Sequence, residues 1–164
     1  MKHSAAILGA VLLATVANAA GRVIYAGPAW AAIDLGASCD ARARSELLAP
    51  KGKVQANAGF AFTPDHRRWG EFHAQLSRVP RPGSSVMLTI GNQNFLLVDR
   101  GGWAWANGAG QDRAIIDLAR IGDGFRIRFR DQTGRRFTDS YSLAGGPTAI
   151  DAAAAACAGK MQPR

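Results

Sequence analysis

Apolar and polar residues alternate along several short stretches of the chain, and this period of two predicts strands. The clearest stretch is 125–130, where Phe125, Ile127 and Phe129 alternate with three arginines. The same alternation, or a short apolar run, recurs at 30–35, 39–44, 54–62, 71–78, 86–90, 95–98 and 137–143. Turn signals separate these stretches, among them 80–83, 91–94 and 131–134. Many short strands with turns between them predict a sandwich.

The period changes twice, and each change predicts a helix. Residues 112–121 place Ile115, Leu118 and Ala119 on one helical face, and Gly122 follows where a helix commonly ends. Residues 148–160 follow Pro147, which suits the first turn of a helix. Residues 103–105 form either a short strand or an aromatic bulge. The expected fold class is all-β: an antiparallel β-sandwich with one short helix and a C-terminal helix.

The first 19 residues have the features of a secretory signal peptide. Lys2 supplies a positive start, residues 5–16 are an uncharged apolar run, and residues 17–19 (Ala-Asn-Ala) match a cleavage site. The run is shorter than the roughly 20 apolar residues that span a bilayer. An uncleaved anchor or a buried helix is the alternative. We expect cleavage, which leaves residues 20–164 as one periplasmic or secreted domain without a transmembrane segment.

The chain is basic, and most of its positive charge is arginine. It carries 20 Lys and Arg against 12 Asp and Glu; without Lys2 the balance is 19 against 12, or +7. In an exported protein this charge argues against nucleic acid as the partner. It favours anionic surfaces such as lipid headgroups, acidic glycans or an acidic protein patch. The alternative is a general surface charge that maintains solubility.

Cys39 and Cys157 are the only two cysteines. An even count in an oxidising compartment predicts a disulfide, and two cysteines allow one intramolecular pairing. That bond would tie an early strand to the C-terminal helix. Two buried free thiols, or a metal or nucleophile site, are the alternatives, although neither a Cys-x-x-Cys motif nor metal-ligand spacing is present.

Few residues suggest catalysis. His66 and His73 are the histidines of the mature chain, and they are candidates for a general base or, with Asp65, for a metal site. No nucleophile elbow, zinc-protease motif or nucleotide-binding fingerprint accompanies them, so we interpret both as solvated residues. Ser140 is a possible nucleophile, but a strand that turns Tyr141 inward is the simpler interpretation. We expect no catalytic residue, metal site or cofactor.

The arginine row is a sharper feature. Arg126, Arg128 and Arg130 project from one face of a strand, with about 6–7 Å between neighbours. Arg135 and Arg136, across the turn, extend this candidate anion-binding patch. Arginine forms bidentate contacts with phosphate, sulfate and carboxylate groups. A solvated outer face without a partner is the alternative.

Two tryptophans form a second candidate site. Trp103 and Trp105 share a phase if the backbone is extended, so together they would make an aromatic platform for a sugar or a peptide. Packing in the core is the alternative interpretation.

The segments 125–134 (FRIRFRDQTG) and 139–143 (DSYSL), followed by Gly145 and an alanine-rich helix ending in Cys157, resemble the C-terminal half of the invasion associated locus B family. Segments 90–97, 103–106 and 119–122 are similar as well, so the resemblance covers roughly residues 54–158. It implies an exported bacterial β-sandwich of immunoglobulin-like type, with no catalytic site or cofactor. Some members from pathogens are linked to entry into host cells.

These observations predict an exported, non-enzymatic envelope protein that acts as a binding or interaction module. Its expected partner is an anionic component of the envelope or of a host surface. A periplasmic hydrolase and a small-ligand or glycan-binding protein are the alternatives.

Overall fold

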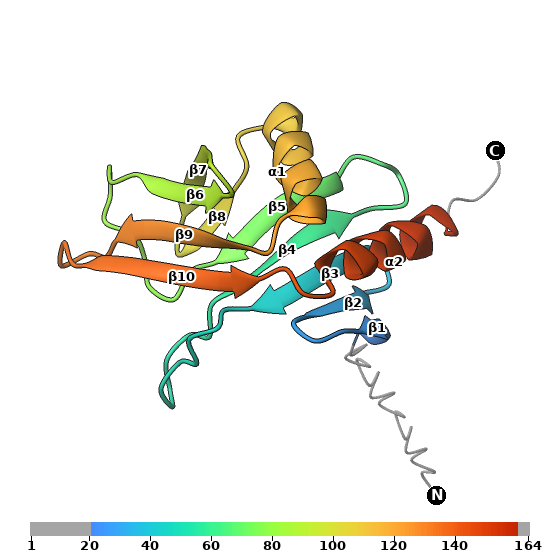
Figure 1. The fold of residues 1–164 in the computed structure, drawn as a ribbon, viewed down its shortest axis with the longest axis horizontal. Coiled ribbons are helices and arrows are strands. Elements are labelled where there is room, and N and C mark those ends of the chain that lie inside the picture. Colours follow the sequence, from blue (N-terminus) through green and yellow to red (C-terminus); the bar gives the residue numbers. More distant parts are fainter. Residues whose placement is uncertain (1–20, 161–164) are drawn as a thin grey trace, which may run out of the picture.

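The computed structural model describes residues 21–160, and within them ten strands and two helices form one antiparallel β structure (Figure 1). The signal peptide predicted for residues 1–19 lies outside the described residues. The strands are β1 (Arg22–Ala26), β2 (Trp30–Asp34), β3 (Cys39–Arg44), β4 (Asn57–Phe62), β5 (Trp69–Gln75), β6 (Val86–Ile90), β7 (Gln93–Arg100), β8 (Trp103–Trp105), β9 (Gly124–Arg130) and β10 (Arg136–Ser142). The helices are α1 (Ala109–Ile121) and α2 (Gly146–Ala158). The predicted mostly β chain with one short helix and a C-terminal helix is confirmed.

The strands follow the order β1-β2-β3-β4-β5-β8-β7-β6-β9-β10, and all their pairings are antiparallel. Strand β7 joins two layers, because it pairs with β8 on one side and with β6 on the other. One layer contains β1 to β5 and β8, and the other contains β6, β9 and β10. The result is a sandwich-like sheet that folds over one core.

Aromatic side chains fill the space between the two layers. Trp30 on β2 and Phe72 on β5 both pack against Phe125 on β9, with ring centroids 6.5 Å and 5.9 Å apart. Phe60 stacks on Trp30, and Phe125 stacks on Tyr141 of β10. All five are buried. Because the inward positions alternate along each strand, the residues between them form the two outer faces.

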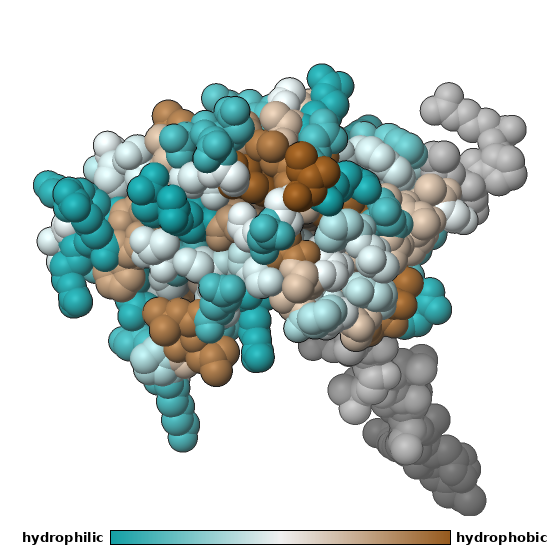
Figure 2. Space-filling view, in the orientation of Figure 1, coloured by the Kyte–Doolittle hydropathy of each residue, from teal (hydrophilic) through white to brown (hydrophobic). Residues whose placement is uncertain are grey.

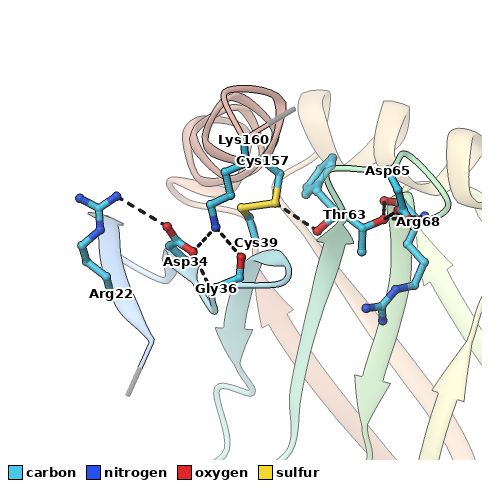
Figure 3. The surroundings of a disulfide bond; sticks show 10 residues. Arg22, Asp34, Gly36, Cys39, Thr63, Asp65, Arg68, Cys157 and Lys160 are labelled. Carbon is cyan, nitrogen blue, oxygen red and sulfur yellow. Dashed lines mark hydrogen bonds and ion pairs between the residues drawn. A yellow bond between two sulfur atoms is a disulfide. The ribbon is translucent and has the colours of Figure 1, made fainter. Parts of the chain in front are cut away.

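Helix α2 covers β2 and β3, and α1 packs against β5 (Figure 1). The inward side of α2 carries the buried residues Ala149, Ala153 and Cys157, whose small side chains let the helix lie close to the sheet. Cys157 forms a disulfide with Cys39 at the start of β3, which confirms the predicted bond (Figure 3). Just beyond the helix, the Lys160 ammonium pairs with Asp34 and donates to Gly36 O, 2.9 Å away.

Strand β1 was not predicted. Its five residues (RVIYA) do not alternate between apolar and polar. Four of them are exposed and one is half-buried. It pairs only with β2 and forms one edge of the sheet. An edge strand with little contact to the core needs no buried face, so it leaves no period of two in the sequence.

The described residues contain no helix that is long and apolar enough to span a membrane.

Asp139 of β10 is buried beside Tyr141, and its Oδ2 accepts the Ser77 N–H at 2.9 Å. This is the partner that a carboxyl on the inward phase requires. Burial raises the pKa of Asp139 above its usual range, despite that hydrogen bond. The fold therefore favours the protonated carboxyl. Stability from this group is complete below the pKa of the unfolded chain, about 4, and is lost as pH rises through the raised pKa of the folded state.

Asp139→Asn should remove this pH dependence, because an amide oxygen still accepts the Ser77 N–H but carries no charge. We expect the urea-unfolding free energy of wild type to fall relative to that of the variant as pH rises from 4 towards 7. Burial also raises the pKa of Asp112, but this residue is present in both proteins, so its contribution cancels. Parallel pH profiles for the two proteins would contradict the assignment.

Candidate functional site

The arginine row lies on the outer face of β9, as predicted. Arg126, Arg128 and Arg130 are exposed, and the residues between them are buried. In the register of the hairpin, Arg126 faces Ser140, Arg128 faces Thr138 and Arg130 faces Arg136. We call Arg126, Arg128, Arg130 and Arg136 the arginine face. On the other side of β9, strand β6 places Thr89 opposite Arg126 and Met87 opposite Arg128.

The arginine face has no acidic counterpart. None of its four side chains forms an ion pair with any carboxylate in residues 21–160. Arg128 donates to Thr89 Oγ1 at 3.3 Å, and Arg130 donates to Gly134 O at 2.9 Å. Like charges directly opposite each other destabilise a sheet, and Arg130 lies opposite Arg136. The fold therefore maintains a cationic surface that its own side chains do not neutralise.

A shallow groove of about 500 Å³ crosses the arginine face. It is lined by Arg128, Arg130, Arg136 and Thr138 of the hairpin, and by Ser85 and Met87 from the β6 side. Figure 2 shows hydrophilic residues gathered over the tip of the β9–β10 hairpin, at the left of the view. Guanidinium and hydroxyl donors around a groove suit an oxyanion such as phosphate, sulfate or carboxylate.

Arg135 does not belong to the arginine face. Its guanidinium carbon lies 5.8 Å from the centre of the Phe137 ring, and Phe137 in turn stacks on the buried Phe129. Arg135 therefore shares the phase of Phe137, while Arg136 shares that of the arginines on β9. The difference between Arg135 and Arg136 follows from the period of two along a strand. Residues 135 and 137 point to one side, and residue 136 points to the other.

Trp103 and Trp105 lie on the outer face of the other layer, outside the core. Both are half-buried, and Ala104 between them is fully buried. Their ring centroids are 6.4 Å apart with an interplanar angle of 21°. The two side chains therefore lie on the same face of β8, which is the shared phase expected of an extended backbone.

A polar network lies beside this platform. His73 of β5 and Asp40 of β3 are both buried, and His73 Nε2 lies 3.0 Å from Asp40 Oδ1. The guanidinium of Arg42 pairs with the other carboxylate oxygen, Oδ2. Strand β4 lies between β3 and β5, so the contact between Asp40 and His73 passes over Gly59 of β4. A Cβ at position 59 would lie 3.0 Å from Asp40 Oδ1 and 3.2 Å from His73 Nε2. Only a residue without a side chain leaves room for the contact.

The predicted solvation of His73 is therefore wrong. His73 does lie on the outer, polar phase of β5, but Trp103 and Trp105 of β8 cover that part of the outer face. His73 lies opposite Trp105 in the β5–β8 register, and its ring centroid is 6.2 Å from that of Trp103. Together with Asp40, Arg42, Glu71 and the two tryptophans, His73 lines a groove of about 350 Å³, which we call the tryptophan groove.

The other candidates for chemistry are placed apart. His66 is exposed in the loop before β5, where it stacks on Trp69 at 3.8 Å between ring centroids. Asp65 Oδ1 is engaged within that loop, accepting from Thr63 Oγ1 and Arg67 N. Across residues 21–160 the structure has no group of three or more His, Cys, Asp or Glu side chains that could hold a metal ion. Ser140 lies on the outer phase opposite Arg126, while Tyr141 points inward as predicted.

Asp40, Arg42 and Glu71 were not identified as site residues. Their sequence signal was limited to the polar phase of two predicted strands.

Comparisons with models of protein families, with curated proteins and with solved structures found no match to this chain. What the protein does is therefore inferred from the chemistry of its own surfaces.

Proposed function

We propose that the chain is an exported, non-enzymatic binding module whose arginine face holds an anionic component of the cell envelope or of a host surface. The observation that carries this proposal is the set of four exposed arginines without an acidic partner in the described residues, including the cross-strand neighbours Arg130 and Arg136. Planar guanidinium groups bind phosphate, sulfate and carboxylate through paired hydrogen bonds.

Export belongs to the same proposal. The signal-like residues 1–19 support it, and so does the disulfide, because such bonds persist in oxidising compartments. The resemblance of residues 125–157 to the invasion associated locus B family supports an immunoglobulin-like variant of the sandwich, with a role at the envelope or in contact with host cells.

Charge reversal tests the arginine face. We expect the triple variant Arg126→Glu, Arg128→Glu, Arg130→Glu to bind phosphatidylglycerol vesicles about a hundredfold more weakly than wild type, because each basic residue near an anionic surface contributes roughly 1 kcal/mol. Elution from heparin should move to lower salt. The vesicle and heparin measurements separate lipid phosphate from glycan sulfate as the preferred anion. Both measurements are made at several salt concentrations, since screening weakens exposed charges.

The matched control is Arg44→Glu, Lys51→Glu, Arg100→Glu, which changes net charge by the same amount at exposed positions that line none of these grooves. A smaller loss in this control supports the arginine face. Equal losses in both triple variants would show that only net charge matters, and unchanged binding would dismiss the face.

A periplasmic hydrolase is the second candidate, and the observation that favours it is His73 paired with Asp40 in a groove. Such a pair can orient an imidazole as a general base. The pair alone is incomplete, because a nucleophile must lie within hydrogen-bond reach of the imidazole. Among the residues of the structure, the one side-chain hydrogen bond of His73 is to Asp40, and no hydroxyl bonds to its ring. Binding therefore remains the function that the geometry supports best.

A further inference from the structure

The tryptophan groove continues into a second groove. The neighbouring hollow, about 680 Å³, extends past Trp69 towards the start of α1. The two hollows have Arg68, Glu71 and Trp105 in common as lining residues. The two hollows are therefore adjacent, and together they follow the outer face of β5 and β8 as one elongated site. Grooves of this size suit small ligands and segments of a polymer.

Three of the four tryptophans line this groove. Trp103 and Trp105, whose ring planes are 21° from parallel, form a pair at one end. At the other end Trp69 is 39% exposed, and its ring is held between His66, which stacks on it, and Phe62, which packs edge-on with centroids 5.3 Å apart. All three rings keep part of their apolar surface open to water in the free protein, since Trp69 is exposed and Trp103 and Trp105 are half-buried. Such rings are the usual means of binding a ligand that has flat apolar surfaces.

Both arginines and carboxyl groups line the two hollows. The arginines are Arg42, Arg67, Arg68 and Arg113, and the carboxyl groups are those of Asp40, Glu71 and Asp112. The Asp40 carboxylate pairs with the Arg42 guanidinium and lies against the His73 ring. Both of these partners are strand residues, Arg42 on β3 and His73 on β5. Glu71 lies 3.9 Å from the Arg68 guanidinium. Asp40 and His73 are more than nine-tenths buried, with side chains 5% and 9% exposed, so their positions are fixed before any ligand arrives. The groove thus offers donors and acceptors together with apolar faces, in contrast to the purely cationic arginine face.

We propose that this groove binds a neutral oligosaccharide chain. Sugar rings present C–H faces that pack on tryptophan and a rim of hydroxyls that both donate and accept hydrogen bonds, which matches the mixture of rings, carboxylates and guanidinium groups. A strongly anionic ligand would instead meet Asp40 and Glu71. The site is independent of the arginine face, which lies on β9 and β10 in the other layer.

The experiment titrates the protein with chitotetraose and cellotetraose, two neutral tetrasaccharides, and with a heparin tetrasaccharide as the anionic probe. The indole N–H signals of the four tryptophans report the site by NMR. We expect a neutral probe to shift the signals of Trp69, Trp103 and Trp105. The signal of Trp30 should stay unchanged, because its indole is buried and donates to Ser142 O at 2.8 Å. No movement of the three groove signals, or movement with heparin alone, would overturn the proposal.

Calorimetry on variants tests the contribution of the rings. Trp105→Ala should weaken binding of the neutral probe about tenfold, since one stacking contact is worth roughly 1 kcal/mol or more, and Trp105→Phe should recover most of the loss. The triple arginine-to-glutamate variant should bind the tetrasaccharide as wild type does. Equal affinity of wild type and Trp105→Ala would refute the site. Where Trp105→Ala does not fold, the NMR titration of wild type decides.

Discussion

Replacing Trp30 with alanine is expected to lower the free energy of unfolding by about 3–5 kcal/mol, the range found for large aromatic residues removed from a core. Trp30 is 1% exposed and packs on Phe60 and Phe125, so its ring joins the two layers of the sandwich. Its indole N–H also donates to Ser142 O, at the end of β10. The loss combines a cavity between the layers with an unsatisfied carbonyl.

Urea unfolding followed by circular dichroism measures this loss, and two variants serve as controls. Trp30→Phe keeps a ring between the layers but removes the N–H donor, so its stability should fall between those of wild type and Trp30→Ala. Leu47→Ala removes a side chain that is 77% exposed and should change stability by less than about 0.5 kcal/mol. A Trp30→Ala protein that unfolds at the same urea concentration as wild type would rule out Trp30 as the link between the layers.

Paired strands that each bury one face and are joined by a clear turn were the easiest to predict. The hairpin of β9 and β10 is the best example, because Asp131, Thr133 and Gly134 form its turn. Inward and outward positions alternate along both strands, and Asp139 is the one charged residue on the inward phase. Asp131 Oδ1 accepts from Thr133 N and Arg135 N, and Gly134 has φ +85°. Local turn chemistry and a buried face on each strand together determine the register. The placement of the arginine face follows from that register.

The tryptophan groove could not be predicted, because it depends on pairing between distant segments. Strand β5 pairs with β8, and β6 and β7 lie between them in sequence. The sequence places His73 on the polar phase of β5 and Trp105 in the phase of Trp103. It contains no local signal that these two phases lie on one surface, or that Gly59 leaves space for His73 to reach Asp40. Long-range pairing thus converts an apparently solvated histidine into a buried one.

Eliminating the disulfide is the second change for which we expect a large effect. The Cys39–Cys157 bond joins residues separated by 118 positions, with Cα atoms 5.7 Å apart. Such a link restricts the unfolded chain over most of its length, and removal of a native disulfide from a small disulfide-bonded domain typically costs about 2–5 kcal/mol. Against a total stability of about 5–15 kcal/mol, this is a large fraction.

The double variant Cys39→Ala, Cys157→Ala should therefore unfold at a clearly lower urea concentration than wild type while keeping the same circular dichroism spectrum when folded. The spectrum is expected to persist because α2 still packs on β2 and β3 through Ala149, Ala153 and neighbouring residues, and Lys160 still pairs with Asp34. Alanine is the matched replacement, since both sulfur atoms are buried and a serine hydroxyl there would need a partner.

A reducing agent provides the independent comparison. It should lower the unfolding midpoint of wild type towards that of the double variant and leave the variant itself unchanged. Because the bond acts mainly on the unfolded chain, the difference should appear in the free energy of unfolding and not in the folded spectrum. A wild-type midpoint that does not respond to reductant under unfolding conditions would mean that packing of α2, without the covalent bond, already supplies the stability of this end of the sandwich.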